Sequence, residues 1–261
     1  MSLQGKAALV TGSTSGIGLG IAQALARDGA AVMLNGFGEP AQIEKLRSGI
    51  AAEHGVRVGY AGADMAQPAQ IAAAVRQTAD ELGSLDILVN NAGIQFTAGI
   101  EDFPDERWDA VIAINLSAVF HGMKAAIPFM KRKGWGRIIN VASAHGLVAS
   151  AQKVAYVAAK HGVVGMTKVA AIELANSGVT ANAICPGWVR TPLVEKQLRD
   201  RAAAQGRGLE EVTEDMLAEK QPMRQFSTPD QIGALAVFLC SEAAGTITGA
   251  PLSIDGGWLA Q

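Results

Sequence analysis

The segment AALVTGSTSGIG, residues 7–18, decides the fold of this chain. Its four apolar residues, 7–10, predict a short buried strand, and the glycines at 12, 16 and 18 predict a tight turn into a helix. Backbone N–H groups and the positive end of a helix dipole favour a phosphate at such a turn. The spacing is G-x-x-x-G-x-G and not the commoner G-x-G-x-x-G, so the loop alone is also compatible with a plain strand-to-helix turn.

Short apolar segments and stretches of helical period continue this strand-turn-helix pattern along the chain. Several strands are apolar at consecutive positions, as in a parallel sheet with helices on both faces. We therefore predict one α/β domain over residues 1–261, a doubly wound (Rossmann-type) seven-stranded parallel sheet that binds ligands beyond the carboxyl ends of its strands. The predicted strands are Ala7–Thr11, Ala31–Gly36, Val56–Gly62, Ile87–Asn90, Arg137–Ala142, Thr180–Ile184 and Pro251–Ile254, and Ile17–Asp28 and Gln70–Leu82 are among the crossover helices.

The segment 192–225 departs from this pattern, because it is rich in Glu, Lys, Arg and Gln and has no obvious strand. We interpret it as a partly mobile helical lid over the site. A solvated surface insertion is the alternative.

Composition and charge limit the classes of function. Hydrophobic residues make up 49% of the 261 residues and charged residues 18%, which is typical of a chain that buries a large core. The formal net charge is -2 without a run of like charge, so neither nucleic acid nor a membrane is an expected partner. We find no signal peptide and no segment apolar for long enough to span a bilayer, and expect a cytoplasmic protein. Cys185 and Cys240 lack metal-ligand spacing and no histidine clusters with them, so we expect buried free thiols and no metal site.

The predicted second strand is followed by Asn35-Gly36-Phe37-Gly38-Glu39, at the place where such folds distinguish NAD from NADP. The 2′-phosphate of NADP usually pairs with an arginine or lysine there or in the glycine loop, and neither segment has one. The acidic residue that usually binds the ribose hydroxyls is absent as well. The prediction of NAD as cofactor therefore depends on missing cations.

Two side chains suited to proton transfer lie one helical turn apart. Tyr156 and Lys160, at i and i+4, share one helix face. A phenol has a reference pKa of about 10, so it acts near neutral pH only if positive charge stabilises the phenolate. Lys160 and an oxidised nicotinamide would both supply that charge. Such pairs are also common on surface helices, and this one gains weight from Asn91-Ala92-Gly93 after the fourth predicted strand, Asn115 in an apolar helix, and Ser143 after the fifth strand.

In combination, these motifs resemble the short-chain dehydrogenase/reductase family over the whole chain. The resemblance implies that Tyr156 is the general acid/base, that Ser143 hydrogen-bonds the reacting oxygen, and that Lys160 lowers the tyrosine pKa and holds the nicotinamide ribose. Asn115 would fix a water in the proton path, or would only satisfy a neighbouring backbone group. The implied dinucleotide-binding residues are Gly12, Thr14, Ser15, Gly16, Ile17, Gly18, Phe37, Asp64, Met65, Asn91, Ala92, Gly93, Tyr156, Lys160, Pro186, Gly187, Val189 and Thr191. Asp64 would contact adenine, cap the next helix, or do both.

Five further side chains flank the Asn-Ser-Tyr-Lys tetrad and indicate a substrate class. Gln95, His145, Lys153 and Gln197 resemble the set with which the D-3-hydroxybutyrate dehydrogenases of the family hold a carboxylate, and Trp188 resembles the residue that bounds the methyl end. Each alone is compatible with a solvated loop residue or with packing, but four donors, one of them cationic, would clamp a carboxylate. We therefore expect a small hydroxy or keto acid, interconversion of (R)-3-hydroxybutyrate and acetoacetate, Ser143 and Tyr156 in contact with the substrate, and lid closure that brings Gln197 to the carboxylate.

The helix from about Val154 to Ala175 is apolar on nearly every side, so one face would meet the sheet and the other a partner subunit. The family resemblance implies a homotetramer of twofold symmetry. The alternative enzymes are a 3-oxoacyl thioester reductase and a polyol dehydrogenase, against which the missing NADP cations and the clamp argue. The alternative from another functional class is a non-catalytic dinucleotide sensor, but a sensor would not need the complete Asn-Ser-Tyr-Lys tetrad.

Overall fold

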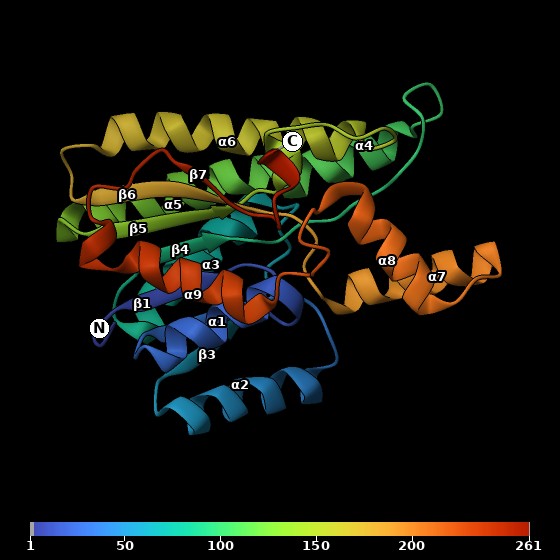
Figure 1. Ribbon diagram of the computed structural model, residues 1–261. Helices are drawn as coiled ribbons and strands as arrows, with labels where there is room; N and C mark the ends of the chain where they lie inside the picture. The colour runs from blue at the N-terminus through green and yellow to red at the C-terminus, as the bar shows by residue number, and fades with distance from the viewer. Residues whose placement is uncertain (1–2, 261) are drawn as a thin grey trace.

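Parallel strands form the centre of the computed structural model, which describes residues 3–260 (Figure 1). Within that range they make one seven-stranded sheet in the order β3-β2-β1-β4-β5-β6-β7. The strands are β1 Ala7–Val10, β2 Ala31–Asn35, β3 Val58–Ala61, β4 Ile87–Asn90, β5 Gly136–Val141, β6 Val179–Pro186 and β7 Pro251–Ile254. The strand predictions are confirmed, each end within two residues. Successive strands are added outward from β1 to β3 on one side of the sheet and from β4 to β7 on the other, and β1 pairs directly with β4. The order of the strands therefore reverses between β1 and β4, and a crevice is expected at their carboxyl ends.

Helices cover both faces of the sheet, as the consecutive apolar residues of the strands predict. In β1, Ala8 and Val10 belong to the core on one face of the sheet, whereas Ala7 and Leu9 belong to the core on the other face. Because successive strand residues point to opposite faces, both sets must be apolar. The helices are α1 Gly16–Arg27, α2 Pro40–His54, α3 Pro68–Leu82, α4 Asp105–Ile112, α5 Ala118–Lys133, α6 Val154–Leu174, α7 Pro192–Gln205, α8 Leu209–Lys220 and α9 Pro229–Cys240.

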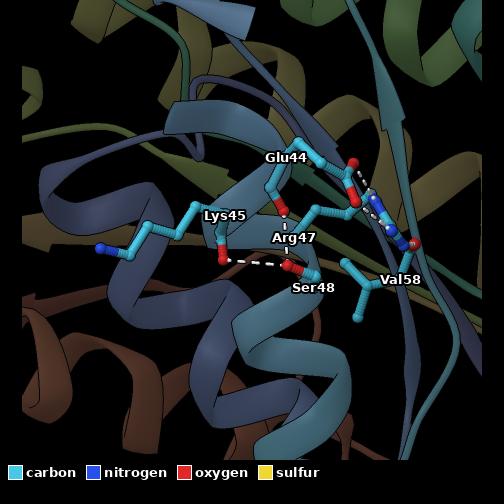
Figure 2. Close-up of polar contacts among 5 residues, drawn as sticks. All are labelled: Glu44, Lys45, Arg47, Ser48 and Val58. Carbon is cyan, nitrogen blue, oxygen red and sulfur yellow. Dashed lines mark hydrogen bonds and ion pairs between the residues drawn. The ribbon is translucent and has the colours of Figure 1, made fainter. Parts of the chain in front are cut away.

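The edge strand β3 is tied to α2 by one arginine (Figure 2). Arg47 Nη1 donates to the Val58 carbonyl at 2.9 Å, while Nε and Nη2 bind the Glu44 carboxylate at 2.8 and 2.6 Å. Ser48 Oγ donates to the Glu44 carbonyl at 2.8 Å, one turn back in the same helix. An edge strand exposes unpaired backbone groups, and the guanidinium occupies one of them. The contact therefore holds α2 against β3. The neighbouring strand β2 ends at the crevice.

α7 and α8 form a helical hairpin that stands off the body of the sheet (Figure 1). We call residues 192–220 the lid hairpin; its helices confirm that 192–225 contains no strand, although an isolated β-bridge joins Val189 and Ser227 just outside it. Val194, Leu198, Ala202, Val212 and Met216 pack together, with Trp188 and Phe226 against them, apart from the two cores of the sheet. The hairpin therefore holds its shape by contacts of its own.

One helical stretch corrects an expectation from the sequence. Asp105–Lys133 is, by length and composition, long and apolar enough to cross a membrane, whereas we expected no such segment. Its second part, α5, packs on β4 and β5 and on α3, and the side chains of Val119, Met123, Ala126 and Met130 are buried there. Packing against the sheet and α3 therefore explains part of its apolar length. Between α4 and α5 the helix widens into a π turn, Ala113–Ser117, which the apolar pattern does not reveal. Cys185 and Cys240 are buried free thiols, as expected.

Candidate active site

A crevice of about 390 Å³ lies at the carboxyl ends of the strands, where the sheet order reverses. Most of the residues expected to bind a dinucleotide line it: Gly12, Thr14, Ser15, Gly16, Ile17, Phe37, Asp64, Met65, Asn91, Ala92, Gly93, Tyr156, Lys160 and Thr191. Gly187 and Val189 line an adjoining cavity instead, and Gly18 and Pro186 line neither. The sequence reasoning missed several lining residues, among them Asn35, Gly36, Ile94, Val141, Pro192 and Leu193.

Glycines let the loop between β1 and α1 turn tightly and pack closely on its neighbours. Gly16 adopts φ +58°, a left-handed conformation that favours glycine. A Cβ on Gly18 would lie 2.3 Å from the Gly12 carbonyl oxygen and 2.4 Å from Asn91 Nδ2, so only glycine fits there. Ser15, the N-cap of α1, makes no side-chain cap, and the positive end of the helix therefore faces the crevice without a capping hydroxyl.

Asn91 fastens this loop to the end of β4. Its Nδ2 donates to the carbonyls of Thr11 and Gly12 at 2.9 and 3.0 Å. The backbone N–H groups of Asn91 and Ala92 both bind Thr11 Oγ1, at 2.9 and 3.0 Å. The residue expected to contact the dinucleotide thus also holds the loop in shape.

Asn35 performs a similar task on the other side of the loop. Its Oδ1 accepts from Gly12 N at 3.1 Å, and its Nδ2 donates to the carbonyls of Ala61 and Ala63, both at 2.9 Å. Asn35 is buried and joins the ends of β1, β2 and β3. In the sequence, this role of Asn35 was indicated only by an amide, in place of the usual acidic residue, at the end of the second strand.

Phe37 projects from the same edge with 70% of its surface exposed. The backbone beneath it is fixed, because Tyr60 Oη donates to the Gly36 carbonyl at 2.7 Å and Thr14 Oγ1 to the Phe37 carbonyl at 3.2 Å. Among residues 3–260, the lining of the crevice contains no arginine, and its one lysine is Lys160. The described crevice therefore places no cation beside Phe37.

Asp64 lines the crevice but does not cap α3, whose N-cap is Gln67. Its Oδ1 accepts from Ala66 N at 2.8 Å, and its carbonyl accepts from Gln67 N at 3.0 Å. The expected helix-capping role is therefore wrong, because the turn 64–67 precedes the helix. The carboxylate stays at the crevice wall.

Tyr156 and Lys160 lie on α6 and both reach the crevice. Lys160 Nζ donates to the Val141 carbonyl at 2.8 Å and lies 5.5 Å from the centroid of the Tyr156 ring. Burial lowers the pKa of Lys160 to about 8. Burial also raises the pKa of Tyr156, and a hydrogen bond with the Ser143 side chain offsets this only in part. In the chain by itself the pKa of Tyr156 is therefore raised and not lowered as we expected, because the loss of water on burial outweighs the hydrogen bond with Ser143.

Asn115 is buried in the π turn and lines neither cavity. Its Oδ1 accepts from Ile94 N and its Nδ2 donates to the Ile94 carbonyl, both at 2.9 Å. The amide thus satisfies a neighbouring backbone segment, which is the second of the two roles considered from the sequence. Ile94 precedes Gln95, so this pair of bonds sets where Gln95 enters the site.

A second cavity of about 150 Å³ adjoins the crevice and shares Ile17, Gln95, Tyr156, Thr191 and Leu193 with it. Every side chain expected to hold the substrate lines this cavity: Gln95, Ser143, His145, Lys153, Tyr156, Trp188 and Gln197. They come from the loop after β4, the segment after β5, the start of α6, the loop after β6 and α7. The tertiary structure thus brings together residues that span about a hundred positions, from 95 to 197.

Trp258 is a lining residue that the sequence reasoning missed. Its ring centroid lies 5.1 Å from that of His145 and 6.0 Å from that of Trp188. It follows β7 near the end of the chain, where a lone tryptophan after two glycines gives no signal of its own. The cavity is therefore lined both by aromatic rings and by polar side chains, and we call the polar set its polar wall: Gln95, Ser143, His145, Lys153 and Gln197.

The polar wall carries charge at Lys153 but not at His145 near neutral pH. His145 is buried, with Nδ1 3.5 Å from Ser143 Oγ and Nε2 2.9 Å from Ser150 Oγ. Burial, aided by repulsion from Lys153, lowers the pKa of His145 to about 4. Burial also lowers the pKa of Lys153, and the attraction of Glu219 opposes that shift. The wall thus offers a cation, a neutral imidazole and the two amides of Gln95 and Gln197 to an anionic group.

These features fit a nicotinamide dinucleotide with its substrate. The glycine loop has no room for a Cβ at Gly18, and the helix end beside it suits a pyrophosphate. Tyr156 stands where the crevice meets the smaller cavity, so a reacting carbon in that cavity would lie beside the nicotinamide end of the crevice. The arrangement suits hydride transfer coupled to transfer of a hydroxyl proton.

Comparison with known proteins agrees with this geometry. Residues 12–259 match a family described as enoyl-(acyl carrier protein) reductase. The chain is 61% identical to a D-beta-hydroxybutyrate dehydrogenase of Cupriavidus necator over 261 residues, covering 99% of this chain and 100% of that one. It is 54% identical to a D-beta-hydroxybutyrate dehydrogenase of Rhizobium meliloti over 256 residues, covering 98% and 99%.

Solved structures give the same fold. An L-sorbose reductase from Gluconobacter frateurii, complexed with NADPH and L-sorbose, superposes with a TM-score of 0.95 at 30% identity, covering 100% of this chain and 99% of that one. An actinorhodin polyketide ketoreductase with NADPH superposes with a TM-score of 0.91 at 34% identity, covering 99% of each chain. With the sheet order, the glycine loop and the Ser-Tyr-Lys set in place, the chain belongs to the short-chain dehydrogenase/reductase family.

Proposed function

We propose that this chain oxidises (R)-3-hydroxybutyrate to acetoacetate with NAD, and catalyses the reverse reaction. The observation that carries the proposal is the second cavity, where Gln95, His145, Lys153 and Gln197 surround a space that reaches Tyr156. A cationic donor with neutral donors around it suits a carboxylate. The high identity to two D-beta-hydroxybutyrate dehydrogenases supports the same substrate.

The chain's residues divide the chemistry between orientation and proton transfer. Lys153 and the amides hold the carboxylate, so that C3 lies beside Tyr156, and Trp188 and Trp258 bound the methyl end. As the C3 hydroxyl becomes a ketone, its proton passes to Tyr156 Oη while Ser143 Oγ hydrogen-bonds the same oxygen. When bound, the oxidised nicotinamide would accept the hydride from C3, and its positive charge would favour the phenolate that burial disfavours. Lys160 adds a second positive charge behind the ring.

The choice of NAD follows from the edge of the crevice near Phe37. A 2′-phosphate there would meet an apolar ring and, within the described residues, no arginine or lysine to pair with it. The neighbouring Glu39 is exposed, and its negative charge would repel such a phosphate. The two solved structures described above bind NADPH, so the assay that follows compares NAD with NADP directly.

The decisive experiment is an NADH absorbance assay with both enantiomers of 3-hydroxybutyrate and with 2-butanol, using NAD and NADP in parallel. We expect the (R) acid with NAD to give the highest kcat/KM. A higher kcat/KM for 2-butanol than for the acid would overturn the proposal that the substrate is 3-hydroxybutyrate. Equal kcat/KM values with NAD and NADP would overturn the cofactor.

We further propose a cytoplasmic homotetramer. On α6, Val169 and Ile172 are 53% and 77% exposed, on the side of the helix that does not pack on the sheet. Trp108 of α4 and Phe120 of α5 are also exposed. Exposed apolar side chains on these helices suit an interface between subunits. Sedimentation equilibrium giving the mass of a monomer would overturn this proposal.

A further inference from the structure

The neck of the lid hairpin contains a buried glutamine that the proposed mechanism does not use. We define the neck as residues 188–190 and 221–227, the two segments through which the hairpin joins the rest of the fold. Ser227 N donates to the Trp188 carbonyl at 3.0 Å, and Arg190 N donates to the Ser227 carbonyl at 2.9 Å. The two segments therefore run side by side, and what moves one of them moves the other.

Gln221 lies at the centre of this neck and is fully buried. Its Oε1 accepts a short hydrogen bond from Trp188 N, and its Nε2 donates to the Gln225 carbonyl at 2.6 Å. A Cβ on Gly187 would lie 2.6 Å from Oε1, and one on Gly256 would lie 2.8 Å from Nε2. Two glycines thus leave the space that the amide fills, so its position is fixed by packing as well as by hydrogen bonds.

Trp188, the partner of Gln221, faces two environments. Its ring lines the substrate cavity and lies 5.2 Å from Lys153 Nζ, and it also packs against the apolar cluster of the lid hairpin. Its indole Nε1 is buried and has no hydrogen-bond partner within residues 3–260, so no side-chain bond there fixes the ring. The ring is held by packing, and the backbone bonds to Gln221 and Ser227 hold the main chain from which it projects.

We infer that Gln221 is a positioning residue for substrate specificity: by holding the backbone of Trp188 it sets the tryptophan wall of the substrate cavity and links that wall to the lid hairpin. The residue does not line either cavity, so it acts through Trp188 and not by contact with the substrate. The inference rests on the proposed function for the identity of the substrate, but not for the placement of the wall.

The test is a double-mutant cycle between Gln221→Met, which keeps the length of the side chain without its hydrogen bonds, and Trp188→Ala. In the wild-type background we expect Gln221→Met to raise the KM for 3-hydroxybutyrate about tenfold, with kcat within about threefold and the Kd for NADH unchanged. In the Trp188→Ala background the same substitution should leave KM unchanged, because the wall is already gone. Gln205→Met, on an exposed glutamine of the same hairpin, is the matched control and should change nothing.

A second readout needs no substrate. Intrinsic tryptophan emission should shift on Gln221→Met in the wild-type background and not in the Trp188→Ala background. Gln221→Glu in its neutral form keeps both an acceptor for Trp188 N and a donor for the Gln225 carbonyl, so its KM and its emission should approach the wild-type values as the pH is lowered, even if the methionine variant folds poorly. Equal effects of Gln221→Met in both backgrounds, or no effect in either, would overturn the inference. If the wild type does not oxidise 3-hydroxybutyrate, the proposed function fails while the emission cycle still decides the role of Gln221.

Discussion

Replacing Lys153 by methionine tests whether the substrate cavity is a carboxylate site. Lys153 is half-buried, and its Nζ lies over the Trp188 ring at 5.2 Å. Methionine preserves most of the aliphatic contact with that ring and removes the charge. Any loss specific to an acid substrate then reports the charge and not the packing.

The size of the effect follows from the surroundings of this lysine. His145 is neutral, because burial lowers its pKa to about 4, so Lys153 is the cation that the described lining of the small cavity presents to the substrate. A hydrogen bond to a charged group contributes about 1.5 to 3 kcal/mol. At 1.36 kcal/mol for each factor of ten, kcat/KM for 3-hydroxybutyrate should fall roughly 10- to 150-fold. An uncharged alcohol makes no such bond, so its kcat/KM should change by less than about threefold.

The assay follows NADH absorbance with (R)-3-hydroxybutyrate and with 2-butanol for the wild type and Lys153→Met. Lys196→Met is the matched control, because Lys196 is an exposed lysine of α7 that pairs with Asp200 at 2.7 Å. It should behave as wild type with both substrates. Equal losses on the acid and on the alcohol would refute the carboxylate site, since they would show that Lys153 supports the fold or the cofactor instead.

Three further predictions follow from the site. Tyr156→Phe should still bind NADH in a fluorescence titration, yet lose about 10²- to 10⁴-fold in kcat; a smaller loss would remove the phenol from proton transfer. Gly18→Ala would place a Cβ 2.3 Å from the Gly12 carbonyl oxygen, so affinity for NADH and Tm should both fall, whereas Gly49→Ala, with open space around its Cβ, should lower neither. Burial lowers the pKa of Lys160 from 10.5 to about 8. Above pH 8 the folded chain therefore loses a proton that the unfolded chain keeps, and the free energy of unfolding rises with pH. Relative to Lys160→Met, the wild type should therefore gain about 3 kcal/mol in chemical denaturation between pH 7 and 10.5, and a constant difference would contradict the buried charge.

The strands and the glycine loop were predictable because their signals are local. A run such as Ala7–Val10 is apolar at every position only if both faces of the strand are covered, and a glycine at position 18 is needed wherever loop and helix approach closely. Asn91, Ser143, Tyr156 and Lys160 could be placed at the site because each follows a strand end or shares a helix face with another motif.

The remaining features depend on contacts between distant segments. Trp258 enters the substrate cavity from the end of the chain, and Gln221 reaches Trp188 across the neck of the lid hairpin. The π turn that carries Asn115 has no signature in an apolar helical pattern. Residue type and spacing cannot indicate such partners, because the distances between these residues in space are set by how the helices pack on the sheet.

By itself, the sequence determined the order of strands and helices along the chain and the position of the crevice, since hydrophobic period and turn chemistry act over a few neighbouring residues. It also proposed Ser143, Tyr156 and Lys160 as the reacting set. Only the tertiary structure decided the protonation of that set. Whether the pKa of Tyr156 rises or falls depends on the balance between lost water and nearby charge, and both are fixed by packing in three dimensions. The tertiary structure also decided that Asn115 binds the backbone of Ile94 and that His145 stays neutral beside Lys153.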